Sequence, residues 1–128
     1  MTLNEINFNC HLESLFEYKD EQAFSQFIPT SVFVKADNQD ELIAKLGTFR
    51  IENFGYLDGL VHTLTNEEMK EVFIRVGGEV RIDLTELLYI VARLYKDSEN
   101  KIQFHQFGDL YAESLEINDN VIKVHIGS

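Results

Sequence analysis

Residues 71–95 read EVFIRVGGEVRIDLTELLYIVARLY, and this stretch indicates the fold class. Glu71–Val76 is rich in β-branched and aromatic side chains and stops at Gly77-Gly78, which predicts a strand followed by a turn. Residues 84–95 are apolar around most of a helical circumference, as expected for a helix buried against a sheet. A strand followed by a buried helix is typical of α/β proteins.

The segments on either side extend the alternation of strands and helices. Ser31–Ala36 (SVFVKA) predicts a strand, and Asp37-Asn38 can cap a following helix whose apolar residues lie within 42–46. Another strand is expected at Lys101–Phe107. Because helices separate these strands, we expect an α/β domain of two or three layers with a mostly parallel central sheet.

Two terminal segments lie outside this expected core. Pro29 ends an N-terminal helical appendage, residues 1–29, because proline cannot extend a helix. Residues 108–128 contain two strand-like runs around Asn118-Asp119-Asn120, which predicts a C-terminal β-hairpin. The length of 128 residues fits one domain, 1–128, with its core at residues 31–107.

The chain is strongly acidic. It has 22 Asp and Glu against 11 Lys and Arg, a net charge of -11. This charge repels phosphate backbones and attracts basic proteins, although it also serves solubility alone. We therefore expect neither direct binding to nucleic acid nor, in the absence of a long apolar segment, insertion into a membrane. Cys10 is the only cysteine, which excludes an intrachain disulfide and fits a reducing cytoplasm.

The motifs of common catalytic sites are absent. The sequence has no glycine-rich phosphate loop and no Gly-x-Ser-x-Gly elbow. Its four histidines, His11, His62, His105 and His125, lack the close spacing of metal ligands on one helix. We therefore expect no catalytic residue, no metal and no cofactor. A binding protein is favoured over a small enzyme, which remains an alternative.

Residues 53–65, NFGYLDGLVHTLT, carry the most informative pattern. Apolar side chains recur at i, i+3, i+4 and i+7, which predicts a helix with one buried stripe. These side chains are Leu57, Leu60, Val61 and Leu64. The same spacing places Asp58, His62 and Thr65 on another face, and residues 54–56 would shape a loop that leads into a partner's cleft. An ordinary solvated helix face is the alternative interpretation.

Residues 31–107 resemble the barstar-like family of nuclease inhibitors and toxin immunity proteins. The similarity lies in the order and spacing of six segments: SVFVKA, DELIAKL, FGYLDGLVHTLT, VFIRV, LTELLYIVARLY and KIQFHQF. The resemblance implies a three-stranded parallel sheet packed by helices. It also implies that an acidic helix and the loop before it enter the active site of a nuclease.

The resemblance assigns partner contacts by position to Phe54, Gly55, Asp58 and Thr65. His62 stands where the family has a second acid, so we expect a different toxin as the target, with charge supplied elsewhere. The whole predicted contact set is Glu52, Phe54, Gly55, Tyr56, Asp58, His62, Thr65 and Glu79.

Two functions follow as hypotheses. The first is an immunity-type inhibitor that binds one cognate basic toxin, a nuclease, in a 1:1 complex and blocks its active site. The second is a nucleic-acid mimic that blocks a DNA-binding enzyme, which requires acidic side chains in a surface row at roughly phosphate spacing.

Overall fold

The computed structural model describes residues 2–17, 31–35, 49–52 and 54–128, and this part of the chain is a mixed α/β fold. Its helices are α1 (Leu12–Glu17), α3 (Asn66–Val72) and α4 (Leu84–Asp97), with the short 3-10 helices η2 (Glu99–Lys101) and η3 (Phe107–Asp109). None of the helices in this part combines the length and the apolar character that a bilayer crossing requires.

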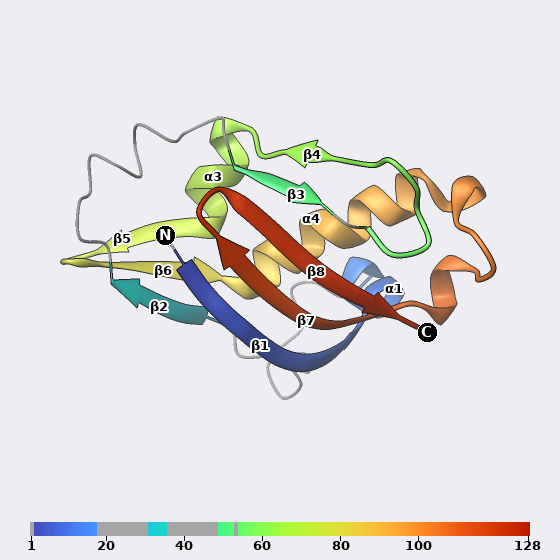
Figure 1. Ribbon diagram of the computed structural model, residues 1–128, viewed down its shortest axis with the longest axis horizontal. Helices are drawn as coiled ribbons and strands as arrows, with labels where there is room; N and C mark the ends of the chain where they lie inside the picture. The colour runs from blue at the N-terminus through green and yellow to red at the C-terminus, as the bar shows by residue number, and fades with distance from the viewer. Residues whose placement is uncertain (1, 18–30, 36–48, 53) are drawn as a thin grey trace.

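The larger sheet has five strands in the order β1, β7, β8, β3, β4. Their bounds are β1 Thr2–His11, β7 Tyr111–Asn118, β8 Val121–Gly127, β3 Arg50–Glu52 and β4 His62–Thr63. Neighbouring strands are antiparallel except β3 and β8, which pair in parallel with Ile51 opposite Ile122. Figure 1 shows this sheet running in front of α4.

The second sheet is smaller and entirely antiparallel. It has the order β2, β6, β5, with bounds Ser31–Lys35, Glu79–Asp83 and Phe73–Val76. It lies at the left-hand end of Figure 1, where the β5–β6 hairpin extends outward. The opposite end holds the chain that follows α4 and the C-terminus, with the loop between β3 and β4 close by.

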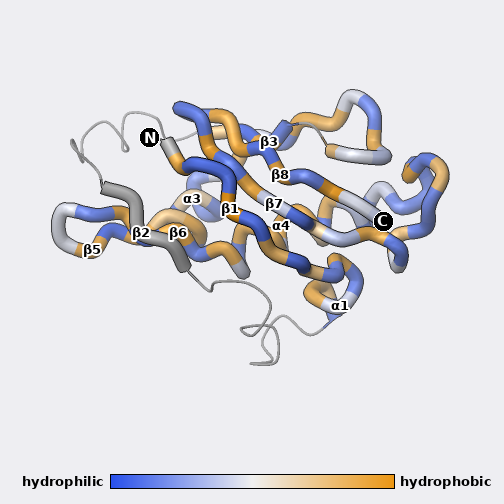
Figure 2. The backbone as a smooth tube through the Cα atoms, turned by 60° about the horizontal axis from the view of Figure 1, so that its bottom comes forward, coloured by the Kyte–Doolittle hydropathy of each residue, from blue (hydrophilic) through white to orange (hydrophobic). Residues whose placement is uncertain are grey.

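Helix α4 supplies one wall of the core. Asp83 caps its first turn by accepting a 3.0 Å hydrogen bond from the Glu86 backbone, and one side of the helix is buried. Its buried residues are Leu84, Leu87, Leu88, Ile90, Val91, Ala92 and Tyr95. Helices α1 and α3 pack on it, and hydrophobic and hydrophilic residues alternate along the strands of the larger sheet (Figure 2).

Several predicted elements are confirmed. The helix expected at residues 84–95 extends from Leu84 to Asp97, and the strand expected at 31–36 is β2. The C-terminal hairpin also forms, with Asn118 opposite Val121 across its turn. This hairpin is not peripheral, however, because β7 and β8 are inner strands of the larger sheet. The helix expected around residues 42–46 lies outside the described residues.

The expectation of a mostly parallel sheet is wrong for the described strands, among which only β3 and β8 run in parallel. The reason is that two tight connections, β5 to β6 and β7 to β8, force antiparallel neighbours. The prediction counted 71–76 as one strand and overlooked β6. Within that segment α3 continues to Val72 before β5 begins.

The helix predicted over residues 53–65 is also wrong. The described part of this segment, from Phe54, forms turns and then the short strand β4. Tyr56 and Gly59 adopt left-handed φ angles of 64° and 73°, which interrupt a right-handed helix. Leu57 and Leu64 are nevertheless buried, so the apolar spacing identified part of the core without giving the backbone shape.

The strand predicted at Lys101–Phe107 is absent, and that segment runs from η2 through an irregular stretch into η3. Its backbone bonds to a loop instead of a strand, since the Gln103 amide donates to the carbonyl oxygen of Tyr56 at 2.9 Å. The N-terminal appendage was predicted as helical, but only α1 is helical among its described residues. Strand β1 precedes α1 and pairs with β7.

Candidate functional site

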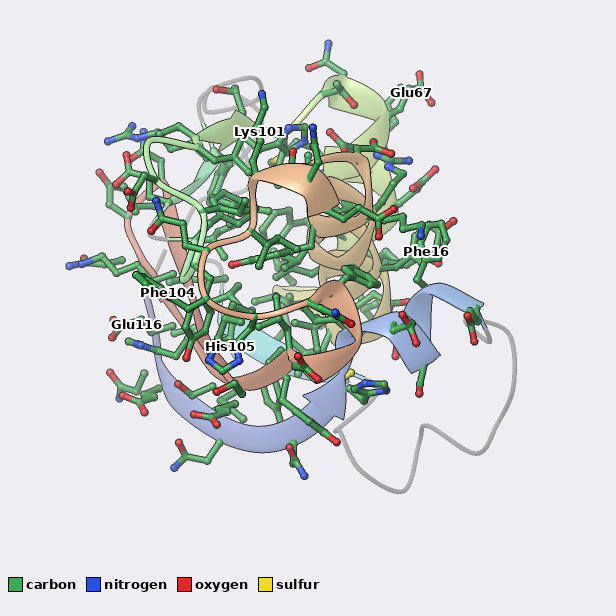
Figure 3. The ribbon with its side chains drawn as sticks, turned by 90° about the vertical axis from the view of Figure 1, so that its right-hand side faces the viewer. Phe16, Glu67, Lys101, Phe104, His105 and Glu116 are labelled. Atoms are coloured by element: carbon green, nitrogen blue, oxygen red, sulfur yellow. The ribbon has the colours of Figure 1, made fainter. Side chains whose placement is uncertain are left out.

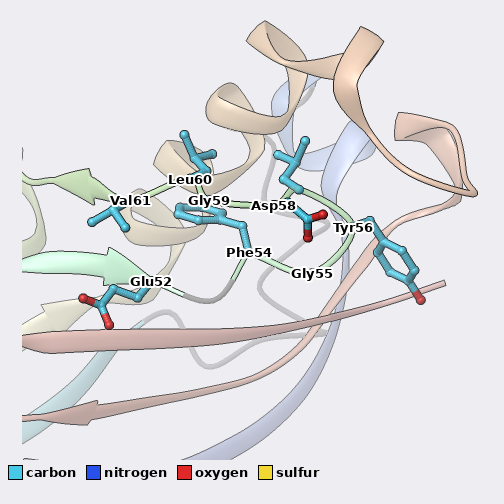
Figure 4. A pocket seen from close by; sticks show the side chains of 9 residues that line it. Glu52, Phe54, Gly55, Tyr56, Asp58, Gly59, Leu60 and Val61 are labelled. Atoms are coloured by element: carbon cyan, nitrogen blue, oxygen red, sulfur yellow. The ribbon is translucent and has the colours of Figure 1, made fainter.

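Glu52 and residues 54–61 border an open hollow of about 620 Å³ at the end of strand β3 (Figure 4). The lining residues are Glu52, Phe54, Gly55, Tyr56, Leu57, Asp58, Gly59, Leu60 and Val61. We call this the 52–61 surface. It includes five of the eight predicted contact residues: Glu52, Phe54, Gly55, Tyr56 and Asp58.

Hydrogen bonds from two distant segments hold this loop. The hydroxyl of Tyr95 on α4 donates to the carbonyl oxygen of Gly55 at 2.6 Å, and the Gln103 amide donates to that of Tyr56 at 2.9 Å. Within the loop, the Leu57 amide donates to the Phe54 carbonyl at 3.2 Å. The loop is therefore fixed to the core on one side and to the segment after α4 on the other.

Phe54 supports the loop from the core side. Its side chain is buried, and its ring centroid lies 5.8 Å from that of Tyr95 in a tilted arrangement. Leu57 is buried beside it in the same core cluster. The Phe54 ring packs in the core and has little surface to offer a partner, so its observed role is to support the loop.

Two carboxylates reach the hollow from different sides. Glu52 forms an ion pair with the Arg50 guanidinium on the same strand. Asp58 is exposed and accepts a 2.9 Å hydrogen bond from the side-chain amide of Gln103. Asp58 also lines a second, smaller hollow of about 390 Å³, together with Ser98 and Lys101.

His62 and Thr65 belong to a different cluster, centred on Glu68 in the first turn of α3. The Glu68 side chain has 9% of its surface exposed, and its carboxylate accepts from His62 Nε2 at 2.9 Å and Arg93 Nη2 at 3.2 Å. It also accepts from the Thr65 amide at 2.9 Å, while the Thr65 hydroxyl accepts from the Glu68 amide at 3.1 Å. This reciprocal capping box starts the helix.

The environment of Glu68 favours its charged form. Burial alone raises the pKa of the carboxyl, but hydrogen bonds from the Thr65 backbone and from His62 outweigh burial and lower the pKa below its ordinary value. The cluster thus stabilises the start of α3. The capping pattern Thr-x-x-Glu at residues 65–68 was a sequence signal for this helix start that the helix prediction over 53–65 obscured.

Glu79 is not brought to the same site. It lies on β6, next to the turn of the β5–β6 hairpin at the left-hand end of Figure 1, whereas the 52–61 surface faces the other half of the molecule. The structure therefore divides the predicted contact set into three places. These are the 52–61 surface, the Glu68 cluster and the distant hairpin.

The sequence interpretation missed the segment after α4 as part of the site. Gln103 binds both the Tyr56 carbonyl and the Asp58 carboxylate, and the His105 ring meets the Tyr56 ring edge-on at 4.9 Å. Between them, Phe104 is 92% exposed. Figure 3 shows this end of the molecule with Phe104 and His105 labelled. Aromatic residues beside polar ones at 103–106 were the available signal, but they were interpreted as an alternating strand.

No protein-family model, curated protein or solved structure matches this chain. The site is therefore interpreted from its own geometry. Across the described ranges, no three His, Cys, Asp or Glu side chains are grouped so that they could hold a metal ion. What the 52–61 surface offers is an anchored loop with an open hollow, two carboxylates and adjoining aromatic side chains.

Proposed function

We propose that this protein is an immunity-type inhibitor that binds a basic toxin nuclease in a 1:1 complex through the 52–61 surface. The observation that carries the proposal is that Glu52, Tyr56 and Asp58, predicted as contacts from sequence, border one open hollow. Together with the net charge of -11, this places acidic groups on an anchored, accessible loop.

Charge favours a basic protein as the partner. A nuclease is positively charged around its phosphate site, so an acidic protein is drawn to that site and excludes the substrate by occupying it. The attraction makes association fast and sensitive to salt, because exposed charges are screened beyond about 10 Å at 0.1 M ionic strength.

The anchoring of the loop favours tight binding. Tyr95 and Gln103 fix the backbone of the 52–61 surface from two sides, at the carbonyl groups of Gly55 and Tyr56. A loop that is already ordered loses less conformational freedom when it binds, and this lowers the entropic cost of association.

The class of partner comes from the resemblance to the barstar-like family, and we propose that kinship on the sequence pattern alone. In this proposal the contact is made by a loop instead of a helix face, since the residues that suggested a helix form turns and a short strand. The proposed site of action is the cytoplasm, where a nuclease toxin would meet nucleic acid.

The first test is binding to the purified product of the neighbouring reading frame, at low and then moderate salt, followed by a nuclease assay. We expect a 1:1 complex in which nuclease activity is lost. Replacement Asp58→Asn should weaken binding by about 10-fold or more, because it removes an exposed charge at the hollow.

Glu79→Gln is the matched control, since it removes the same charge at the distant hairpin and should change the dissociation constant less than about twofold. Equal losses of affinity in Asp58→Asn and Glu79→Gln would show that only the net charge matters. That result would contradict the assignment of the 52–61 surface as the binding site. If the chain instead captures a DNA-handling enzyme and leaves the nuclease active, the nucleic-acid mimic replaces this proposal.

A further inference from the structure

We infer that Phe104 is the apolar anchor of the interface, inserted by this protein into a pocket of its basic partner. The inference rests on the proposed function and extends it from the 52–61 surface to the segment after α4. It starts from exposure: among the large hydrophobic side chains of the described ranges, Phe104 is 92% exposed, Val61 54% and Val76 49%.

Exposure of Phe104 is unfavourable in the free protein. A phenylalanine that is transferred out of water gains about 1.5–3 kcal/mol, and Phe104 forgoes most of this gain. Its backbone adds a further cost, because φ is +68°, in the left-handed region that residues other than Gly, Asn and Asp rarely adopt. Packing within the free chain does not offset the exposure of the ring or the strain of the backbone. Burial of the ring in a partner would recover the cost of its exposure.

The neighbours of Phe104 hold it beside the 52–61 surface. Gln103 bonds to the Tyr56 carbonyl and the Asp58 carboxylate at 2.9 Å each, and the His105 ring contacts the Tyr56 ring at 4.9 Å. Phe104 is thus flanked on both sides by residues that are tied to the loop. The backbone that carries Phe104 is therefore already in place before binding, which lowers the entropic cost of association, and aromatic side chains are prominent among the hot spots of protein interfaces.

The other two exposed apolar side chains, Val61 and Val76, lie in different parts of the molecule. Val61 borders the same hollow, whereas Val76 lies beside the turn of the distant β5–β6 hairpin. Of the three large apolar side chains found exposed among the residues whose burial is described, Val61 borders the hollow and Phe104 lies between two residues that contact Tyr56, one of which also bonds to Asp58. Apolar anchors surrounded by charge are the usual composition of a protein interface.

Charge decides which partner fits. A second copy would bring another net charge of -11 to the contact, and nucleic acid or an anionic membrane would also be repelled. The occupant that fits is a basic protein with an apolar pocket bordered by Lys or Arg side chains. The pocket would receive Phe104, and the cationic rim would face Asp58; an Arg could also stack on the Phe104 ring.

The experiment uses the intact protein and, as the probe, the purified product of the neighbouring reading frame, with titration calorimetry at two salt concentrations. Phe104→Gly should weaken binding by about 30-fold or more, as for an interface hot spot. The same variant should raise the Tm of the free protein by about 3 °C, because glycine relieves the left-handed strain. Phe104→Asn, which also tolerates this backbone, should bind as weakly as Phe104→Gly.

Val76→Ala is the matched control and should leave binding unchanged, since it shortens an exposed apolar side chain at the far end. Phe104→Gly should also keep the wild-type salt dependence, whereas Asp58→Asn reduces it. Wild-type affinity in both Phe104 variants, with a loss in Asp58→Asn, would overturn the anchor and leave the proposed function standing. No binding by the wild-type protein would overturn both.

Discussion

The hydroxyl of Tyr95 donates a 2.6 Å hydrogen bond to the carbonyl oxygen of Gly55, which connects helix α4 to the 52–61 surface across 40 residues of sequence. The Tyr95 side chain is buried, and burial raises the pKa of the phenol well above its ordinary value. The hydroxyl therefore remains a donor throughout the physiological range. A core residue thus fixes the position of an exposed loop.

Tyr95→Phe should lower the free energy of unfolding by about 1–1.5 kcal/mol, because it removes one buried hydrogen bond while the ring still fills its place. The Gly55 carbonyl then loses its partner, and the loop should exchange its amide hydrogens faster. Urea unfolding and hydrogen exchange measure the two effects. Tyr56→Phe is the control, because the Tyr56 hydroxyl is exposed and makes a long hydrogen bond of 3.4 Å to Ser128 Oγ. A comparable loss of stability in Tyr56→Phe would contradict the role assigned to the Tyr95 hydrogen bond.

Glu68→Gln should lower the free energy of unfolding at pH 7 by about 1–2 kcal/mol, because charge-assisted hydrogen bonds to His62 and Arg93 become weaker. The pKa of Glu68 is lower in the folded protein than its ordinary value of 4.5. Its stabilisation is therefore present above pH 4.5 and is lost as the pH falls from there through the lowered folded pKa.

The difference between wild type and Glu68→Gln should accordingly shrink below about pH 4.5, as measured by urea unfolding across a pH series. Glu67→Gln, an exposed neighbour in the same helical turn, is the control and should change stability by less than about 0.5 kcal/mol. A difference that stays constant down to pH 2 would show that folding does not lower the pKa of Glu68.

Gly59→Ala should cost about 1 kcal/mol of stability, because Gly59 has a left-handed φ of 73° that alanine adopts only with strain. No atom lies within 4 Å of the added Cβ, so a steric clash contributes nothing. Gly78→Ala is the comparison: it has equal space and no positive φ, and it should be neutral or slightly stabilising. Equal effects at the two positions would contradict the backbone explanation.

Cys10 should be almost unreactive toward thiol reagents in the folded protein. Its side chain is buried, and burial raises the pKa of the thiol to about 11, so very little thiolate is present at pH 8. We expect labelling by a chromogenic disulfide to be at least about 100-fold slower than in urea-unfolded protein. Rapid labelling without denaturant would show that strand β1 opens readily at its junction with α1.

Local sequence signals predicted the elements whose shape depends on residues close together in the sequence. Helix α4 was recognisable because its apolar residues lie within one continuous segment, 84–95. The hairpin of β7 and β8 was recognisable from two strand-like runs around residues 118–120. Strand β1 carries a period-two signal in Ile6, Phe8 and Cys10, which the prediction of a helical N-terminal appendage did not take into account.

The structure brings part of the predicted contact set together, but with a backbone conformation other than the predicted helix. Phe54, Gly55 and Asp58 were assigned by position in the barstar-like pattern and Glu52 for its charge, and the structure brings these four and Tyr56 to one hollow. His62 and Thr65 were assigned outward roles because a helix was assumed. In the structure they bond to Glu68, which also accepts a hydrogen bond from Arg93 of another helix.

The sequence by itself determined the acidic charge, the lone cysteine, helix α4 and the C-terminal hairpin, since each depends on composition or on contacts between near neighbours. Only the tertiary structure decided the strand directions, the turns at 54–59 and the exposure of Phe104. Apolar spacing reports which residues leave water, whereas backbone shape depends on distant partners such as Tyr95 for Gly55 and β8 for β3.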